Sequence, residues 1–431
     1  MEQKKNVFVL GLEEFNLAKL NRLPEARECR FLPALKFSEI RGVENISIKE
    51  LLDLIDERIR DAGSIDAIVS YWDFPGTILV PIVAKKYGLF GPSLESILKC
   101  EHKYWSRLEQ QKVIPGNIPH FKAFDPFDED SYEQINFMPP FWIKPIKSFH
   151  SFLAYRVNDP SHFSECNREV CEHINYISEP FSYILREYVA AREFGQMKES
   201  MIAETMIAGH QCTVEGYSFG NEVVVYGIVD SVREEDRSSF SRYEYPSSLP
   251  QEIQFRMVDL ARRVIEEIGL ENSAFNIEFF YNETANQIYL LEINPRISQA
   301  HTDLFEKVHG VSHHQIMLNL ALNRRPKSLT YNGDFRVAAH FMLRTFHPGF
   351  VLSAPLNQEI EHLKTKYPEL EVQVNVKEGM DLNEMGMHHL DSYSFILANV
   401  FLGGRNRDEL LEKYNDVTDH LNFKVESFIK V

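Results

Sequence analysis

Acidic and amide side chains alternate with apolar ones in two neighbouring segments of the chain. The segments 274–281 and 288–293 are separated by a short polar stretch, and this pattern predicts a β-hairpin. Side chains alternate between the two faces of a strand, so Glu292 and Asn294 share one face. If Glu278 on the first strand points to that face too, two carboxylates and an amide oxygen converge there. Such hard oxygen ligands suit Mg²⁺ and favour a metal site.

The residues around this hairpin support the same interpretation. Without a cation the two carboxylates would repel each other, and one of them would tend to keep its proton. Arg296 follows directly after Pro295, which ends the strand, and its planar guanidinium can bind a phosphate or a carboxylate. The alternative is an edge hairpin with solvated polar residues. The apolar residues on both strands argue against it, because they predict that the hairpin is packed.

The first part of the chain alternates between strand and helix patterns. Apolar runs at 7–10 and 67–71 predict strands, and apolar spacing at 48–59 and 78–87 predicts helices. Alternation of this kind predicts a parallel sheet covered by helices, here a Rossmann-like N-terminal domain over residues 1–110. No G-x-G-x-x-G motif follows the first strand, so support for a dinucleotide site is weak.

The hairpin belongs to a central region that we assign to residues 111–330. Prolines are frequent between 112 and 140 and predict a connector, since proline is disfavoured in helix interiors and central strands. Helices are predicted at 252–269, 302–309 and 312–322. Further strands are predicted at 141–146, 183–189, 201–207, 212–219 and 222–229.

The last hundred residues predict a small C-terminal α+β domain over 331–431. Strand patterns occur at 336–343, 371–376 and 394–401, and a final helix is predicted at 407–421. The fold class expected for the whole chain is therefore a combination of α/β and α+β.

The composition is that of a soluble globular enzyme, with 44% hydrophobic and 25% charged residues. A formal net charge of −17 repels a polyanion, so we expect no nucleic-acid partner. No apolar run approaches the roughly 18 residues that span a bilayer, so we expect no membrane partner. Five cysteines without C-x-x-C spacing argue against disulfides and a zinc site. With no visible signal peptide, these features predict a cytoplasmic location.

The strand end Glu292-Ile-Asn-Pro-Arg296, with Glu278 on the partner strand, resembles the metal-binding strands of the ATP-grasp superfamily of ligases. The resemblance implies that Glu278, Glu292 and Asn294 hold Mg²⁺, or Mn²⁺, against the phosphates of ATP. It implies that Arg296 neutralises the transferred phosphate or an acyl-phosphate. It covers nearly the whole chain and implies an ATP-grasp fold with a two-subdomain ATP-binding region and a C-terminal domain like that of carboxylate–amine ligases and biotin carboxylases.

Other segments resemble the nucleotide site of this family. Lys103 and Lys144, in Cys100-Glu-His-Lys103 and Phe141-Trp-Ile-Lys144, resemble the two lysines that reach the phosphates. The stretch 203–207, followed by Gly209 and Glu215, resembles the hinge that holds adenine and ribose. The resemblance thus implies nucleotide contacts from Lys103, Lys144, Glu204, Thr205, Met206, Ile207 and Glu215, and catalytic roles for Lys144 and Arg296.

Each of these residues has an ordinary structural alternative. Lys103 could be a charge at the start of a helix, and Lys144 or Glu204 a solvated strand residue. Glu187 rivals Glu204 for the hinge, but the residues after Glu204 match the spacing of the family better. His301 could contact a substrate or be a hydrogen-bonded structural residue.

The chain departs from the family after Lys144. The family usually has a glycine-rich loop that covers the phosphates, whereas residues 146–151 contain no glycine. Lys147, Ser148 and Ser151 could supply donors instead. This departure leaves open a nucleotide-binding protein without catalysis.

The resemblance implies an ATP-dependent ligase that activates a carboxylate as an acyl-phosphate and joins it to an amine, releasing ADP and phosphate. The implied partners are a small carboxylate and an amine such as an amino acid, and a homodimer is compatible with the sequence. A biotin carboxylase-like reaction shares the same ATP chemistry and stays open. The sequence has no P-loop and no G-x-S-x-G motif that would indicate a competing chemistry.

Overall fold

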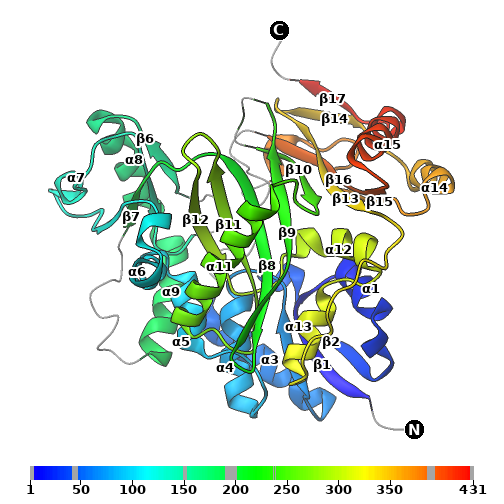
Figure 1. Cartoon of the computed structure of the whole chain (residues 1–431), viewed down its shortest axis with the longest axis horizontal. Coiled ribbons are helices and arrows are strands. Elements are labelled where there is room, and N and C mark those ends of the chain that lie inside the picture. Colours follow the sequence, from blue (N-terminus) through cyan, green and yellow to red (C-terminus); the bar gives the residue numbers. More distant parts are fainter. Residues whose placement is uncertain are drawn as a thin grey trace.

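The chain folds around a large antiparallel sheet that occupies the centre of Figure 1. The computed structural model describes residues 4–40, 47–148, 153–189, 201–235, 237, 239–385 and 394–427. Within these residues the strands form an eight-stranded large sheet, a four-stranded small sheet, a three-stranded N-terminal sheet and a two-stranded ribbon. The result agrees with the predicted mixture of α/β and α+β structure.

The N-terminal sheet is parallel, as the alternating sequence pattern predicts. Strand β1 (Lys5–Leu12) lies between β2 (Cys29–Lys36) and β3 (Ala67–Ser70). The sequence analysis did not predict β2, which contains Pro33; the proline is tolerated because β2 is an edge strand. The helices of this part are α1 (Glu14–Arg22), α2 (Phe37–Ile40), α3 (Ile48–Ala62), α4 (Gly76–Tyr87), α5 (Leu94–Glu101) and α6 (Lys103–Val113).

The large sheet takes strands from both the central and the C-terminal parts of the chain. Its order is β12-β11-β8-β9-β10-β13-β16-β15. The strands are β8 (His210–Phe219), β9 (Glu222–Arg233), β10 (Phe240–Tyr245), β11 (Ser273–Asn282), β12 (Gln287–Asn294), β13 (Val337–Thr345), β15 (Glu371–Val374) and β16 (Phe395–Gly404). Because β10 pairs with β13, the C-terminal strands β13, β16 and β15 continue this sheet.

Helix α11 (Gln251–Ile268) covers one face of the large sheet and lies across its front in Figure 1. It ends at Gly269, which adopts a left-handed conformation with φ of 70°. Its apolar stripe, which includes Met257 and Val264, packs in one core with Ile277 and Phe279 of β11. Each such fully buried side chain contributes roughly 1.5–3 kcal/mol, so this packing fixes which face of the hairpin is left for polar residues.

The small sheet corrects two predictions. Its order is β4-β7-β5-β6, with β4 (Phe121–Phe124), β5 (Phe141–Pro145), β6 (Tyr155–Val157) and β7 (Met201–Thr205). The proposed connector 112–140 contains β4 and the short helix α7 (Ser131–Gln134). The strand predicted at 183–189 is wrong, because α9 (Asn175–Tyr188) occupies most of it and α8 (Pro160–His173) precedes it. Phe181, Ile184 and Leu185 are buried at helical spacing, which outweighs the β-type composition of the segment.

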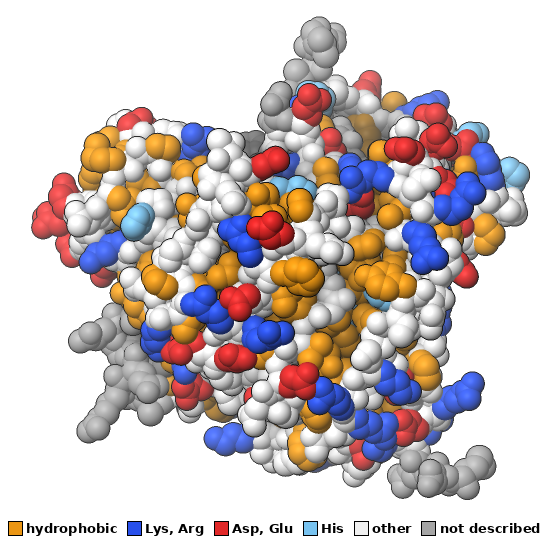
Figure 2. All heavy atoms as spheres, in the orientation of Figure 1, with side chains coloured by type: hydrophobic (Ala, Val, Ile, Leu, Met, Phe, Trp, Pro, Cys, Tyr) orange, Lys and Arg blue, Asp and Glu red, His pale blue; other side chains and the backbone are white. Residues whose placement is uncertain are grey.

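Most of the remaining elements pack around the C-terminal strands of the large sheet. They are α12 (Thr302–His309), α14 (Asn357–Lys366), α15 (Arg407–His420) and the ribbon of β14 (Gly349–Ser353) with β17 (Lys424–Ser427). Helix α13 (His314–Ala321) packs instead against β11 and the N-terminal strand β3. Helices α11, α12, α13 and α15 confirm the helices predicted there. None of the described helices is long and apolar enough to cross a membrane. Figure 2 shows the face of the molecule that is turned to the viewer in Figure 1. Acidic and basic side chains are interspersed on this face, and hydrophobic side chains gather towards its middle.

Candidate active site

The register of β11 and β12 places Glu278 directly opposite Glu292, and Asn276 directly opposite Asn294. Directly opposed residues of an antiparallel pair project from the same face of the sheet. The predicted convergence of the two carboxylates on one face is therefore confirmed. On the other side of β11, Glu215 of β8 lies opposite Asn276 and extends this polar face across a third strand.

The two opposed carboxylates have different electrostatic environments. Glu278 accepts a 2.9 Å hydrogen bond from the Nε2 of Gln211, and burial together with the charge of Glu292 raises the pKa of Glu278 to about 7. Burial also opposes ionisation of Glu292, but the charges of Lys103 and Lys144 outweigh it and lower the pKa of Glu292. One carboxyl group thus tends to hold a proton beside an ionised partner, which is the state that a divalent cation would replace.

The donor set of this face fits Mg²⁺. The Nδ2 of Asn294 donates to the Oδ1 of Asn276 at 3.1 Å, so the carbonyl oxygen is the atom that Asn294 can offer to a cation. Among the described residues, no three His, Cys, Asp or Glu side chains converge closely enough to hold a metal by themselves. Mg²⁺ commonly binds one or two carboxylates and completes its shell with water and substrate phosphates, so the two glutamates and the amide are sufficient.

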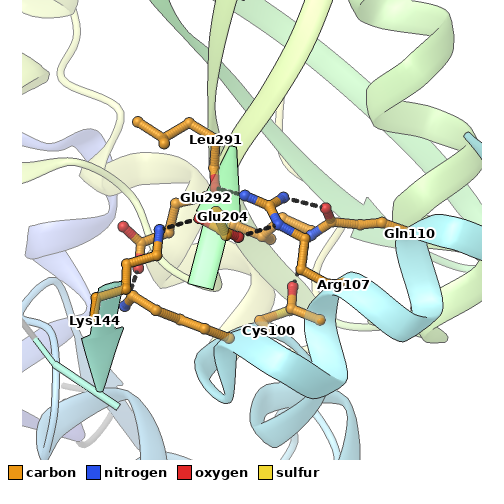
Figure 3. A pocket seen from close by; sticks show the side chains of 10 residues that line it. Cys100, Arg107, Gln110, Lys144, Glu204, Leu291 and Glu292 are labelled. Atoms are coloured by element: carbon orange, nitrogen blue, oxygen red, sulfur yellow. Dashed lines mark hydrogen bonds and ion pairs between the residues drawn. The ribbon is translucent and has the colours of Figure 1, made fainter. Parts of the chain in front are cut away.

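A small pocket lies between α6, the small sheet and the end of β12 (Figure 3). Its free volume is only about 10 Å³, far below the roughly 300–1,000 Å³ of usual small-molecule sites, so the side chains that line it nearly close it. Ion pairs at its wall join Lys103 to Glu292 at 2.8 Å and Lys144 to Glu204 at 2.5 Å. A triphosphate would therefore have to separate these pairs. The lining residues are Cys100, Lys103, Ser106, Arg107, Gln110, Lys144, Glu204, Leu291, Glu292 and Ile293.

Glu204 is held by two cations. The Nε of Arg107 lies 2.6 Å from its Oε1, and the Nζ of Lys144 lies 2.5 Å from its Oε2. Burial opposes ionisation of Glu204, but Arg107 and Lys144 outweigh it and lower the pKa of this carboxyl to about 2. Figure 3 shows Lys144 and Arg107 approaching Glu204 from different elements. The sequence-predicted residues Lys103, Lys144, Glu204 and Glu292 are thus brought into one pocket.

The sequence analysis missed Arg107, although α6 carries a signal for it. The lining residues Lys103, Ser106, Arg107 and Gln110 follow the spacing i, i+3, i+4 and i+7, so they share one face of the helix. The helix begins after His102, whose Nδ1 accepts a 3.1 Å hydrogen bond from the backbone N–H of Trp105. This polar face of α6 begins at Lys103, a predicted nucleotide ligand, and its spacing is the sequence signal for Arg107.

Arg296 lies beyond the end of β12, and within the described part of the chain its guanidinium makes only long contacts. Its Nη1 donates to the carbonyl of Ile297 at 3.3 Å, and its Nη2 lies 3.5 Å from the Oδ2 of Asp73. Its Nε is buried and has no hydrogen-bond partner among the described residues. Its backbone is fixed, because the Nδ2 of Asn276 donates to its carbonyl at 3.0 Å. The side chain can therefore offer donors to an anion without a change in the backbone.

Glu215 lies behind Arg296 and does not line the pocket. It is fully buried, its Oε1 lies 2.8 Å from the Nδ1 of His301, and its Oε2 accepts a 3.3 Å hydrogen bond from the hydroxyl of Tyr226. Burial raises the pKa of Glu215 to about 7. His301, which the sequence left open between substrate contact and structure, is hydrogen-bonded here to Glu215. These bonds support the segment that follows Arg296.

The predicted hinge lies at the end of β7, beside the pocket. The backbone N–H of Thr205 donates to the carbonyl of His120 at 2.9 Å, and Met206 is 37% exposed. Gly209, two residues after Ile207, has φ of 142°, and a Cβ there would lie 2.2 Å from the carbonyl oxygen of Tyr281. The turn between β7 and β8 thus requires glycine. The rival Glu187 is exposed on α9.

The segment predicted to replace the glycine-rich loop is only partly described. Lys147 is buried and pairs with Glu101, and its Nζ lies 3.5 Å from the Oδ1 of Asp73. Its ammonium group therefore faces these two carboxylates and would have to leave Glu101 to donate to a phosphate. The carbonyl of Ser148 accepts a 3.2 Å hydrogen bond from Lys103. Ser151 lies outside the described residues.

Comparisons with known proteins agree with this fold. Residues 137–303 match the family model of the ATP-grasp domain. An L-amino acid ligase from Bacillus licheniformis has a similar structure, with a TM-score of 0.72 over 99% of this chain and 100% of that chain at 16% identity.

Two further structures are similar. A phosphoribosylglycinamide synthetase from Anaerococcus prevotii has a TM-score of 0.64 over 98% of this chain and 100% of that chain at 14% identity. A biotin carboxylase from Campylobacter jejuni has a TM-score of 0.66 over 97% of this chain and 92% of that chain, also at 14% identity. At identities this low, the structural similarity shows a shared fold and does not extend to function.

Proposed function

Residues 137–303 of this chain form an ATP-grasp domain, and from that premise we propose that the protein is an ATP- and Mg²⁺-dependent ligase that joins a carboxylate to an amine. The observation that carries the proposal is the opposition of Glu278 and Glu292 on the polar face of β11 and β12, beside a pocket with Lys103 and Lys144. This arrangement combines carboxylates for a cation with ammonium groups for phosphates, which is what binding of a magnesium nucleotide requires.

The proposed roles follow from the contacts of each residue. Lys103 and Lys144 would leave their glutamate partners and bind phosphate oxygens of ATP. Glu278, Glu292 and Asn294 would hold Mg²⁺, which supplies positive charge against the phosphates. The backbone at 205–207 would hold adenine, because both oxygens of Glu204 already bind cations. Glu215 is proposed to act through the segment after Arg296.

The proposed reaction has two steps. A carboxylate oxygen of the first substrate attacks the γ-phosphorus of ATP, the bond to the β-γ bridging oxygen breaks, and ADP leaves. The amine of the second substrate then attacks the acyl carbon, phosphate leaves, and the amine loses a proton. Arg296 would bind the transferred phosphoryl group in both steps, because it has donors available beside the end of β12.

A panel of substrates tests the proposal. Purified protein is incubated with Mg²⁺, ATP and pairs of amino acids or small amines, and ADP, AMP, phosphate and product mass are measured. We expect ADP and phosphate in equal amounts with a condensed product for at least one pair. AMP as the product, or ADP release that requires bicarbonate and free biotin, would contradict the proposal. Binding of MgATP without turnover for any pair would instead favour a nucleotide-binding protein without catalysis.

A further inference from the structure

Arg107 connects the two sheets that border the pocket. Its Nε donates to Glu204 of β7 at 2.6 Å, and its Nη1 and Nη2 donate to the carbonyls of Leu290 and Leu291 on β12 at 3.1 and 2.7 Å. The Oε1 of Gln110, one turn further along α6, also accepts from Nη1. These bonds fix the guanidinium in position and orientation, because each of its nitrogens has an acceptor.

The two cations that share Glu204 differ in their freedom to move. The side chain of Arg107 is 3% exposed, that of Glu204 is 5% exposed and that of Lys144 is 15% exposed. Lys144 makes its ion pair at the pocket wall with a flexible aliphatic stem, whereas Arg107 is also bonded to backbone carbonyls of another sheet. Lys144 is therefore the partner that can turn away from Glu204, and Arg107 is the partner that stays.

Departure of Lys144 has an electrostatic consequence for Glu204. A buried carboxylate that loses its partner is strongly destabilised, because no water replaces the lost counter-charge. Glu292, the partner of Lys103, is in a different position, because its side chain is 38% exposed and faces the proposed metal site. Glu204 is not exposed to solvent and does not face the proposed metal site, so its charge must be compensated by a cationic side chain of the protein.

We propose that Arg107 is a positioning residue that keeps the Glu204 carboxylate compensated, so that Lys144 can move from Glu204 to a nucleotide phosphate. This inference rests on the proposed function, because it takes the phosphate contact of Lys144 from there. Without Arg107, Glu204 would hold Lys144 as its single counter-charge and so compete with the nucleotide. Arg107 would then govern nucleotide affinity without touching the nucleotide.

Double-mutant analysis distinguishes this role of Arg107 from a purely structural role in the fold. The dissociation constant of MgADP is measured by calorimetry for the wild type, R107M, E204Q and R107M/E204Q, with thermal unfolding of each variant as the check of folding. We expect R107M to weaken MgADP binding by at least about tenfold, because Lys144 stays with Glu204. R107M/E204Q should recover to within about threefold of E204Q, because removal of the carboxylate charge frees Lys144.

Two further variants complete the experiment. R107K keeps the positive charge but lacks the planar guanidinium with its several donors. It should therefore bind MgADP more tightly than R107M and more weakly than the wild type. K112M is the matched control, since Lys112 lies on the same helix with its side chain 54% exposed and pairs with Glu109 and Glu267 outside the pocket. K112M should bind MgADP as the wild type does.

The outcomes that overturn the inference are specific. Wild-type affinity in R107M overturns it, and so does a folded R107M/E204Q that binds as weakly as R107M. If R107M does not fold, E204Q is compared with R107M/E204Q, and a tenfold weaker double variant shows that Arg107 acts by another route. A wild type that does not bind MgADP at all would overturn the proposed function, and this inference with it.

Discussion

The guanidinium of Arg296 lies 3.5 Å from the carboxylate of Asp73, so a loop of the N-terminal part reaches the proposed site of phosphoryl transfer. Burial opposes ionisation of Asp73, but the charges of Lys147 and Arg296 outweigh it and lower the pKa of Asp73. An ionised carboxylate thus occupies the position that an anion would take beside Arg296. Substrate and product anions must compete with it.

This competition predicts a gain of binding in D73N. Inorganic phosphate should inhibit D73N about 3–10 times more strongly than the wild type, because the repulsion between Asp73 and the phosphate is lost. Product inhibition of ADP formation measures the effect. D53N is the control, since Asp53 is exposed on α3. Equal inhibition of D73N and the wild type would show that phosphate does not bind beside Arg296.

Arg296 itself should act on turnover and much less on nucleotide affinity. R296A should lower the rate of ADP formation by at least about 10²-fold, with the dissociation constant of MgADP changed by less than about threefold. R296K should restore little of the rate of ADP formation, because lysine lacks the planar guanidinium group. Steady-state kinetics and calorimetry give the two values. A large loss of MgADP affinity with unchanged turnover of bound nucleotide would contradict the assignment.

The opposed glutamates should move activity and stability in opposite directions. E278Q should lower Mg²⁺-dependent ADP formation by at least about 10²-fold, because one ligand of the cation is weakened. In EDTA at about pH 8.5, above the raised pKa of Glu278 of about 7, E278Q should be more stable than the wild type by about 0.5–1 kcal/mol, because two like charges no longer face each other across the strands. Urea unfolding measures the second effect.

E283Q provides the control for this pair of measurements, because Glu283 is exposed at the turn between the same two strands. It should change neither quantity. A decrease in the stability of metal-free E278Q would show that Glu278 supports the fold and would weaken its assignment to the metal.

Burial of His102 predicts a dependence of stability on pH. Burial lowers the pKa of His102 to about 3, whereas the ordinary value is 6.5. The unfolded chain therefore binds a proton below pH 6.5 that the folded chain does not, so this contribution to stability is complete above pH 6.5 and is lost as the pH falls. At pH 5 the loss from this residue amounts to about 2 kcal/mol.

H102N removes this titration and keeps an N-cap acceptor for α6. The difference in unfolding free energy between H102N and the wild type should therefore shift in favour of H102N by about 2 kcal/mol between pH 7.5 and pH 5. Urea unfolding across this range measures it. H362N, at an exposed position, is the control. A constant difference between H102N and the wild type would show that His102 takes up its proton in the folded state.

Strand alternation and spacing were sufficient to predict that the proposed metal ligands Glu278 and Glu292 share one face of the hairpin. The alternation of Glu278 and Glu292 with buried apolar residues fixes the face, and the structure confirms it. Helix α11 was also predictable, because its apolar stripe is long and ends at Gly269. Both depend on local periodicity, which a single sequence contains.

Features that depend on distant partners were not predictable from the sequence. The contact of Arg107 with Glu204 joins residues 97 positions apart, and nothing local to either residue indicates it. The pairing of Lys147 with Glu101 could not be predicted either, because its acceptor lies on another element. Segment 183–189 was predicted as a strand because a short window of aromatic and branched residues does not distinguish a strand from a packed helix.

The pairing of β10 with β13 has a practical consequence for any attempt to divide the chain. A fragment that stops near residue 330 would keep β10 but lack β13, the strand whose backbone forms hydrogen bonds with the N–H and C=O groups along one edge of β10. Such an open strand edge is a template for association with further copies. We therefore expect a shortened protein of this kind to accumulate as insoluble aggregates, and co-expression of the missing hundred residues as a separate polypeptide to be the better route to a split, soluble protein.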